Sequence, residues 1–409
     1  MNLFLREDYL KKVRGFYHDT ELIKVITGVR RCGKSSLMKT ISQELLESGI
    51  SQENVIFVDL DKRGFKNIKK DDELEELLSQ FDKISGVKYL FIDEIQNVKG
   101  FEEVLNAFRG DGNYSIFITG SNSYLLSGEL MTKLTGRYIE FEMMPLNFEE
   151  YVAMKKFYSK TVKQNLTEEF DDYIREGGFP KTIFYDNAED KKAYVKSVIK
   201  EIFDKDIKRR VKINNVSVFE KVQTYLINNF GATTSLSNIL SDLKKTGMNI
   251  KRETLYRYIN VLKDAKIVQE CKRFDLKSRK SINGEQKYYL ADLSFYFSTN
   301  TDNRINYGPA LENIVYNYAA SKGYSISIGR IGKLECDFIL RGNDMDYSYI
   351  QVAMTIMESL ETENREYRPF ELIKDNYPKY LLTRNDLIQK RNGIIHKNSP
   401  DFISSGGMF

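Results

Sequence analysis

The sequence predicts a multidomain α/β protein whose first part is built on a parallel β-sheet. Three observations lead to this class. Short apolar runs of strand length alternate with helical patterns over residues 1–146, as in parallel sheets that helices cover on both faces. A glycine-rich loop joins the first run to the first helical pattern. The 409 residues are too many for one ordinary domain, and their hydrophobic fraction of 41% is globular.

Each element of the first part follows from this alternation. The expected strands are residues 21–27, 54–60, 87–93, 114–120 and 138–144. The expected helices between them are residues 35–49, 71–84 and 101–112. Pro145 ends the alternation, so we place the first domain at residues 1–146.

The middle of the chain predicts two further domains. Residues 147–204 are mostly helical in pattern, with one interruption at EGGFP, and we expect a helical lid or linker. Residues 205–290 hold three helix-length segments followed by two β-rich runs, which is typical of a winged helix. Ser237 is the expected N-cap of the second of these helices.

The end of the chain, residues 291–409, predicts a last α/β domain. A helical pattern at 308–323 precedes three strand-like runs, and a charged helical segment and one more strand follow. The tail at 404–409 carries two glycines and is expected to fray.

The composition argues for a cytoplasmic protein without a membrane anchor. Charges begin too early at the N-terminus for a signal peptide, and no run approaches the roughly 18 apolar residues of a membrane span. Cys32, Cys271 and Cys336 are odd in number and far apart, which argues against disulfides and a zinc site. With only His18 and His396, histidine-based metal or triad chemistry is not expected.

Basic residues are concentrated in one block of the chain. Residues 205–290 contain 19 Lys and Arg against 8 Asp and Glu, a net charge of +11, whereas the whole chain carries +4. The rest of the chain is therefore acidic. A basic block in such a protein indicates a polyanionic partner, although a solvated surface is the alternative.

The strongest local signal is the segment GVRRCGKS, which matches the pattern G-x-x-x-x-G-K-[ST] between a strand and a helix. In such a loop, backbone N–H groups and the helix N-terminus face phosphate oxygens. Lys34 would reach the β- and γ-phosphates and Ser35 would bind Mg²⁺, so ATP and Mg²⁺ are the expected cofactors. The expected nucleotide-binding residues are Gly28, Val29, Arg30, Arg31, Cys32, Gly33, Lys34, Ser35 and Ser36.

Two adjacent acidic residues complete the expected site. The apolar run KYLFIDEIQ delivers Asp93 and Glu94 at the carboxyl end of its strand, the edge at which such sheets bind ligands. Asp93 would hold Mg²⁺ through water, and Glu94 would polarise the attacking water. A purely structural role is disfavoured because buried charges are costly.

Three further residues are weaker candidates. Ser121 and Asn122 follow the fourth strand and could hydrogen-bond the γ-phosphate or the water, although Gly-Ser-Asn is equally typical of a turn. Arg137 is the candidate arginine finger, which would stabilise charge on the transferring phosphoryl group, although a surface role is the alternative. If Arg137 acts on another copy of the chain, a homo-oligomer is required.

One ordered set of motifs runs through the chain: GVRRCGKSSL, YLFIDEIQ, ITGSNSYLL, LTGRY, PLNFEEY, EGGFP, DKDIKRR, LENIVYNYAASKG, LECDFIL and YIQVAMTI. In this order they resemble the bacterial and archaeal AAA+ ATPases that carry a C-terminal DUF4143 region. The resemblance implies a P-loop (Walker A) at Gly28–Ser35, an acidic box at Asp93–Gln96 and the finger at Arg137. It also implies a C-terminal half similar to a winged helix followed by a restriction-endonuclease-like fold.

The implied nuclease-like fold raises the question of a second active site. Such folds use a helix glutamate, a strand aspartate and a (Glu or Gln)-x-Lys strand to bind a metal and activate water. The matching positions are Glu312, Asp337, Gln351 and Ala353. Ala353 stands where the lysine is required, and Lys333 is the nearby substitute. We therefore expect a degenerate, nucleic-acid-binding or structural module rather than a nuclease.

The winged-helix segment is the expected DNA-binding surface. Its third helix begins with Lys251 and Arg252, and Tyr256 and Arg257 follow one turn later, where a major-groove helix contacts bases and phosphates. The wing would add Lys272, Arg273, Lys277, Arg279 and Lys280. Binding to a protein partner is the alternative, because winged helices also serve as protein modules.

The sequence thus favours an ATPase (ATP hydrolase) whose nucleotide cycle is coupled to a DNA-binding C-terminal half. One alternative is an ATP-dependent regulatory or signalling switch whose C-terminal half binds a protein. Another is an ATP-gated nuclease. Stimulation of hydrolysis by DNA distinguishes the first from the second, and metal-dependent cleavage identifies the third.

Overall fold

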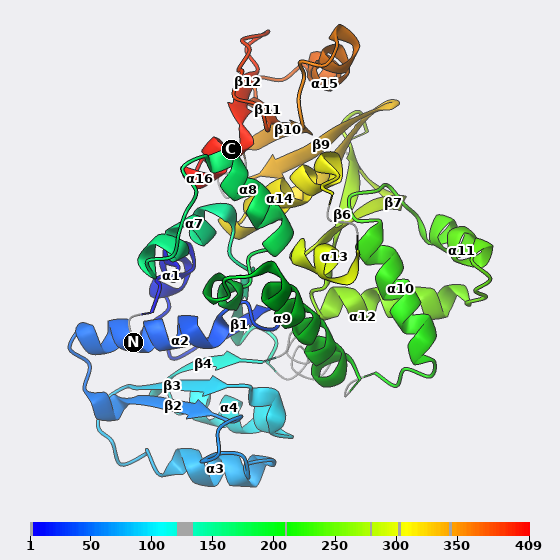
Figure 1. Cartoon of the computed structure of the whole chain (residues 1–409). Helices are drawn as coiled ribbons and strands as arrows, with labels where there is room; N and C mark the ends of the chain where they lie inside the picture. The colour runs from blue at the N-terminus through cyan, green and yellow to red at the C-terminus, as the bar shows by residue number, and fades with distance from the viewer. Residues whose placement is uncertain (1–2, 121–133, 209–210, 279, 302–303, 343–345) are drawn as a thin grey trace. The chain divides into compact units, whose positions relative to one another are not determined.

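The chain folds into two compact units in a computed structural model that describes residues 3–120, 134–208, 211–278, 280–301, 304–342 and 346–409 (Figure 1). Unit 1 comprises Met1–Met143 and Ile202–Val211, and unit 2 comprises Met144–Glu201 and Lys212–Phe409. The backbone therefore passes from one unit to the other three times. Ser121, Asn122 and Arg279 lie outside the described residues.

Unit 1 is built on a parallel sheet with the strand order β2-β3-β4-β1-β5 among its described residues. The five predicted strands and three predicted helices are confirmed, with ends that differ by a few residues. The strands are β1 (Ile23–Gly28), β2 (Val55–Asp59), β3 (Lys88–Asp93), β4 (Tyr114–Thr119) and β5 (Tyr138–Met143). The helical elements are α1 (Glu7–Arg14), α2 (Lys34–Glu47), η1 (Gln52–Asn54), α3 (Asp71–Ser79), η2 (Ile95–Asn97), α4 (Phe101–Gly110) and η4 (Ile202–Ile207).

Helices cover both faces of this sheet. On one face, Leu74 of α3 and Phe101 of α4 join the apolar cluster formed by the strands. Helix α2 contacts the strands with its buried residues Leu37 and Ile41, and Figure 1 shows α2 and α3 on opposite sides of the sheet. Every residue of β1, β3 and β4 is buried, which explains why these strands are mostly apolar in the sequence.

Unit 2 begins with helices, as predicted for residues 147–204. The helical elements of this unit are α7 (Phe148–Phe157), α8 (Leu166–Glu176), η3 (Pro180–Phe184), α9 (Ala188–Glu201), α10 (Val216–Asn228), α11 (Leu236–Lys245), α12 (Arg252–Asp264), α13 (Ser294–Thr299), α14 (Tyr307–Lys322), α15 (Leu360–Leu372) and α16 (Ser399–Ser404). The N-cap prediction for α11 is wrong. Ser235 has the extended backbone of a cap and accepts a hydrogen bond from the N–H of Asn238, whereas Ser237 lies within the helix.

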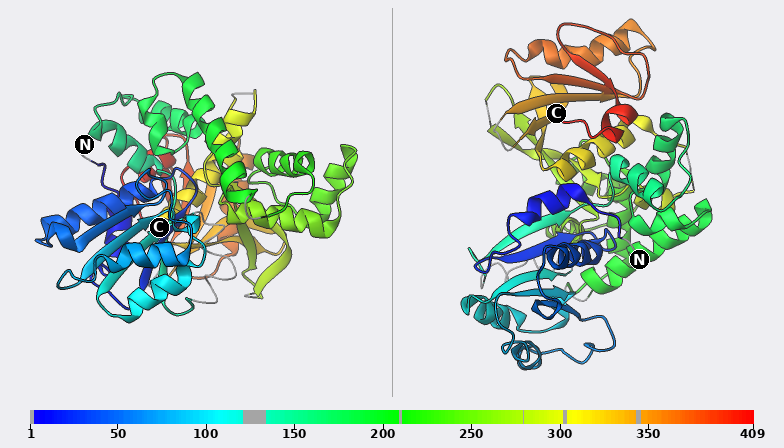
Figure 2. Two further views of the ribbon diagram at one scale, coloured as in Figure 1. Left: turned by 90° about the horizontal axis from the view of Figure 1, so that it is seen from below. Right: turned by 90° about the vertical axis from the view of Figure 1, so that its left-hand side faces the viewer.

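A mixed sheet forms the other layer of unit 2, in the order β12-β11-β10-β9-β8-β6-β7 among the described residues. Its strands are β6 (Val268–Asp275), β7 (Lys280–Leu290), β8 (Ser325–Ile331), β9 (Leu334–Arg341), β10 (Tyr347–Ala353), β11 (Lys379–Thr383) and β12 (Ile395–Asn398). Figure 2 shows α14 and α15 against this sheet from a further direction. The hairpin β6–β7 joins β8, so the sheet continues across the domain boundary predicted at residue 290.

The prediction of a frayed tail is wrong. The ring of Phe409 packs against those of Tyr318, Tyr324, Tyr380 and Phe402. The hydroxyl of Tyr318 donates to the carbonyl oxygen of Gly407 at 2.9 Å. Aromatic burial thus fixes a segment whose glycines suggested mobility. No helix of the described residues is both long and apolar enough to cross a membrane.

Candidate nucleotide site

The glycine-rich loop turns between β1 and α2 at the carboxyl edge of the unit 1 sheet. Gly28 has φ 143°, and a Cβ there would lie 2.2 Å from the carbonyl oxygen of Met143, so only glycine fits. Gly33 has φ 112° at the N-cap of α2 and, having no side chain, provides no cap. The first N–H groups of α2 therefore face the loop, as an anion site requires.

Lys34 is the first residue of α2, and its side chain reaches back to the start of this loop. Its side chain is buried, and the Nζ donates hydrogen bonds to the carbonyl oxygens of Gly28 at 2.9 Å and Val29 at 3.3 Å. No carboxylate of the described residues forms an ion pair with it. A buried ammonium held only by neutral carbonyls is well placed for an anionic ligand, so this loop fits the phosphates of ATP.

Asp93 and Thr119 end neighbouring strands beside the loop. Asp93 is 4% exposed at the end of β3, and the hydroxyl of Thr119 at the end of β4 donates to its Oδ1. Asp93 and Ser35 carry oxygen atoms of the kind that Mg²⁺ prefers in proteins. Among the described residues no group of three His, Cys, Asp or Glu side chains could hold a metal ion.

Glu94 adopts a left-handed backbone conformation, with φ 60°. Its N–H donates to Thr119 Oγ1 at 3.2 Å, and its carboxylate accepts a hydrogen bond from Gln96 Nε2. Burial raises the pKa of this carboxyl, while the positive charges of Arg30 and Lys34 partly oppose the shift. The Glu94 carboxyl is thus desolvated and held by hydrogen bonds, as a general base would be, and a strained backbone of this kind is typical of functional positions.

The structure adds one residue that the sequence analysis missed. Asp206 of η4 forms a bidentate ion pair with Arg30 of the loop, with distances of 3.0 Å from Nε and 2.7 Å from NH2. Both side chains are at least nine-tenths buried, and Arg30 NH2 also lies 3.9 Å from Glu94 Oε2. The Arg30 guanidinium therefore lies between the carboxylates of Glu94 and Asp206. The motif DKDIKRR contains Asp206, but a partner 176 residues away in the sequence cannot be read from it.

This arrangement predicts opposite pH effects for two substitutions. The carboxylate form of Glu94 is lost as the pH falls through its raised pKa, so hydrolysis should decline on the acid side. Arg30→Gln removes a positive charge that lowers the pKa of Glu94. The acid limb of the profile of kcat against pH should therefore move to higher pH. Asp206→Asn removes the charge that neutralises Arg30, so the limb should move to lower pH.

The measurement is the pH profile of kcat for wild type and both variants. ATP titrates identically in all three reactions, so it cancels from the comparison. A common direction of shift for both variants would contradict the shared role of Arg30.

The remaining predicted site residues fall into three groups. Burial raises the pKa of the Cys32 thiol, so it is an unreactive part of the loop. Ser121 and Asn122 lie outside the described residues. Arg137 precedes β5 at the amino edge of the sheet, where its NH1 donates to Asn106 Oδ1.

Arg137 is thus remote from the loop of its own chain. β1 and β5 are parallel and in register from Ile23 and Tyr138 to Gly28 and Met143. Five residue steps separate these ends, on the order of 16 Å along the strands. Arg137 therefore cannot contact the phosphates bound to its own chain without a large rearrangement, and a finger role requires a second copy.

In unit 2, the structure brings together three residues of the predicted nuclease-like site. Glu312 lies on α14, Asp337 on β9 and Gln351 on β10. The N–H of Asp337 donates to Gln351 Oε1 at 3.4 Å. Burial raises the pKa of both Glu312 and Asp337, and the charge of Glu312 raises that of Asp337 further. Ala353 ends β10 and supplies no polar group.

The lysine beside these carboxyls is Lys287 of β7, so the substitution proposed for Lys333 is wrong. Lys287 Nζ lies 2.8 Å from Glu312 Oε2 and 2.9 Å from Glu335 Oε1. Lys333 is exposed in the turn between β8 and β9. An ammonium group therefore balances carboxylates that a metal ion would balance in a nuclease.

The parallel sheet, the glycine loop with its buried lysine and the paired acidic residues define an AAA-type P-loop ATPase domain. A family model described as an AAA domain, AAA_14, matches residues 20–152, and a domain of unknown function, DUF8612, matches residues 167–303. The second match does not confirm the DUF4143 prediction.

The chain belongs to the same family as an uncharacterized protein of Haemophilus influenzae, to which it is 33% identical over 92% of each chain. It is 31% identical to the uncharacterized protein MJ1544 of Methanocaldococcus jannaschii, over 92% of this chain and 86% of that protein. Among solved structures, the Walker-type ATPase PABY2304 of Pyrococcus abyssi has a similar fold, with a TM-score of 0.50 and 18% identity over 72% of this chain and 95% of that one.

Proposed function

We propose that the chain is an Mg²⁺-dependent ATPase whose hydrolysis is coupled to DNA binding by residues 212–409. The observation that carries the first part is the convergence of Lys34, Asp93 and Glu94 at one edge of the sheet. Lys34 binds the β- and γ-phosphates, and Ser35 and Asp93 hold Mg²⁺, which neutralises phosphate charge when bound. Glu94 accepts a proton from the attacking water.

Gln96 orients the base and its water. Its Nε2 donates to Glu94, whereas its Oε1 is buried and has no hydrogen-bond partner among the described residues. A buried acceptor of this kind is costly unless a further donor is present. The attacking water supplies that donor in the proposed reaction.

The coupling to DNA rests on α12, in a segment of three helices and a hairpin that we interpret as a winged helix. Leu255, Tyr258 and Ile259 bury one face of α12, and Arg252, Tyr256 and Arg257 are exposed on the other. Arginine and tyrosine on the exposed face of such a helix suit base edges and phosphates.

The wing contributes less charge than predicted. Lys272, Lys277 and Lys280 are exposed, but Arg273 is not available, because its guanidinium pairs with Glu285 and Glu335. The division of the chain into four domains, with boundaries at residues 146, 204 and 290, also remains a proposal.

We expect wild-type protein to bind blunt duplex DNA with strong salt dependence and to hydrolyse ATP faster when DNA is present. The double variant Arg252→Gln/Arg257→Gln should lower the slope of log affinity against log salt by about 1.8, because each phosphate contact contributes about 0.9. Fluorescence anisotropy at several salt concentrations measures the slope. Lys39→Gln/Lys83→Gln removes equal charge from exposed positions of unit 1 and serves as the control.

Two outcomes would contradict the DNA proposal. Equal slopes for the α12 variant and the control would remove α12 from the interface. ATP hydrolysis that DNA leaves unchanged, together with absent DNA binding, would favour the switch that binds a protein partner.

A further inference from the structure

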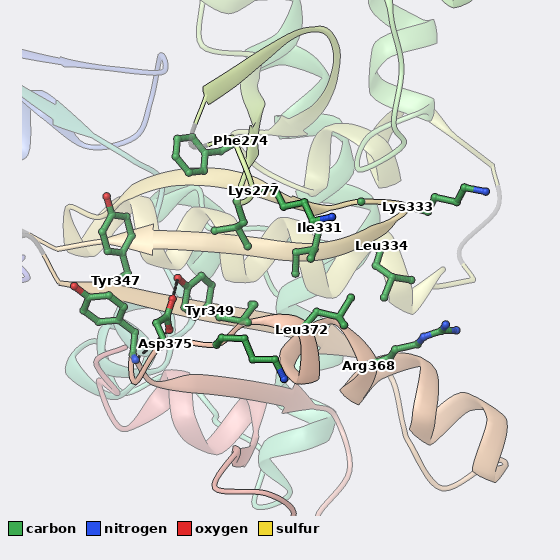
Figure 3. A pocket seen from close by; sticks show the side chains of 15 residues that line it. Phe274, Lys277, Ile331, Lys333, Leu334, Tyr347, Tyr349, Arg368, Leu372 and Asp375 are labelled. Carbon is green, nitrogen blue, oxygen red and sulfur yellow. Dashed lines mark hydrogen bonds between the residues drawn. The ribbon is translucent and has the colours of Figure 1, made fainter.

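A pocket of about 850 Å³ lies within unit 2 (Figure 3). Its wall comes from the turn after β6, the turn between β8 and β9, strand β10, and α15 with the loop that follows it. This volume is within the range of ligand pockets. Neither the nucleotide-site residues nor Glu312, Asp337 and Gln351 line it.

The floor of this pocket is apolar and aromatic. Ile331, Tyr349 and Ile373 are buried there as part of the core of the unit, and Tyr347 packs against them half-buried. The rings of Tyr347 and Tyr377 meet edge to face, with centroids 5.4 Å apart and planes at 65°. Tyrosine rings at a pocket wall present large flat surfaces on which a planar ring can stack.

The rim is cationic. Lys277, Lys333, Arg368 and Lys374 line the opening and are exposed, and none forms an ion pair with a carboxylate of the described residues. Asp375 is the one carboxylate in the described lining, and it accepts a hydrogen bond from the Tyr349 hydroxyl at 2.6 Å. Figure 3 shows Tyr347 at one end of the pocket and Lys333 and Arg368 at the other. The site therefore complements a ligand with flat rings and several negative charges.

We propose that this pocket binds single-stranded nucleic acid, with unpaired bases against Tyr347 and Tyr377 and flanking phosphates on the rim cations. This inference rests on the proposed function in one respect, which is that the chain binds nucleic acid. The surface is different from the exposed face of α12.

The distribution of charge favours a strand over other anions with flat rings. The four cations come from three parts of the wall, which are the turn after β6, the turn between β8 and β9, and α15 with the loop that follows it. Grooves that follow a phosphodiester backbone likewise present cations from several segments. A free nucleotide is better matched by cations that converge on one phosphate group. Bases of an intact duplex are stacked and paired, so they cannot enter without being unstacked.

The test uses full-length protein and a short oligo(dT) strand that carries one 2-aminopurine. Stacking on tyrosine should quench the 2-aminopurine fluorescence when the strand binds. Tyr347→Leu/Tyr377→Leu keeps apolar volume but removes the rings, and should abolish quenching and weaken strand binding about tenfold or more. Lys333→Gln/Lys374→Gln should lower the salt slope by about 0.7 for each phosphate that the variant no longer binds.

Controls separate this proposal from the duplex proposal. Both pocket variants should retain duplex binding and basal ATP hydrolysis, which shows that they fold. Arg252→Gln/Arg257→Gln should weaken duplex binding and leave the quenching unchanged. Absence of duplex binding by wild type would refute the α12 proposal alone.

Two results would overturn the pocket proposal. One is unchanged strand affinity and quenching in the tyrosine variant. The other is competition by dTMP at the same concentration as oligo(dT), which would show a pocket for free nucleotides.

Discussion

Glu94→Gln should abolish most ATP hydrolysis while leaving ATP binding intact. The glutamine keeps the size and hydrogen-bonding capacity of the side chain but cannot accept a proton from water. General-base catalysis contributes about 10² to 10⁴ in rate, so kcat should fall by at least about a hundredfold. Binding should persist because, in the proposed site, Lys34 and the loop N–H groups rather than Glu94 would contact the phosphates. Single-turnover hydrolysis and equilibrium binding of ATP measure the two effects separately.

Glu75→Gln is the matched control, since Glu75 is exposed on α3 and the same change of charge occurs away from the loop. It should behave as wild type. Retained hydrolysis in Glu94→Gln would assign the base to another residue. Loss of ATP binding in this variant would show a structural role for Glu94 instead.

Arg137→Ala should also lose most hydrolysis, and the loss should be reversible by mixing. Arginine fingers contribute about 10³ to 10⁵ in kcat where they stabilise charge on the transferring phosphoryl group. Because Arg137 lies at the amino edge of its own sheet, it can serve only the site of a second copy. Arg137→Ala retains Glu94, and Glu94→Gln retains Arg137. A mixture of the two inactive proteins should therefore regain activity through mixed pairs of subunits.

Arg109→Ala supplies the control for this experiment. Arg109 donates to Asn106 Oδ1 from Nε and NH2, and Arg137 donates to the same atom, so both arginines belong to one surface. Activity in the Arg109 variant should remain. A mixture without recovered activity, in buffers where the proteins associate, would exclude Arg137 as a finger between copies.

The strands and loop of unit 1 were predictable because their signals are local. Strands buried on both faces are apolar at most positions, and a loop that encloses phosphate needs glycine where a Cβ would collide, as at Gly28. Lys34, Asp93 and Glu94 follow from their places relative to those elements. For these residues the position in the sequence is enough to predict the position in the fold.

The predictions that proved wrong concern residues whose packing or pairing depends on partners far away in the sequence. The tail is held by aromatic packing, Arg273 is neutralised by carboxylates from other strands, and Lys287 replaces the lysine expected near Glu312. Asp206 belongs to the same class, because its role depends on Arg30. Pairing with a residue that is distant in the sequence leaves no periodic pattern from which it could be predicted. The charge of such a side chain by itself predicts a solvated surface position.

The short return of the chain to unit 1 at Ile202–Val211 limits how this protein can be divided. A fragment that ends at Met143 would contain the whole parallel sheet, yet Arg30 would lose its carboxylate and η4 would be missing. Unit 2 is likewise interrupted, so no single cut releases either half intact. Such interleaving means that recombination cannot exchange one half for another at one junction, and the two halves must be inherited as a single piece.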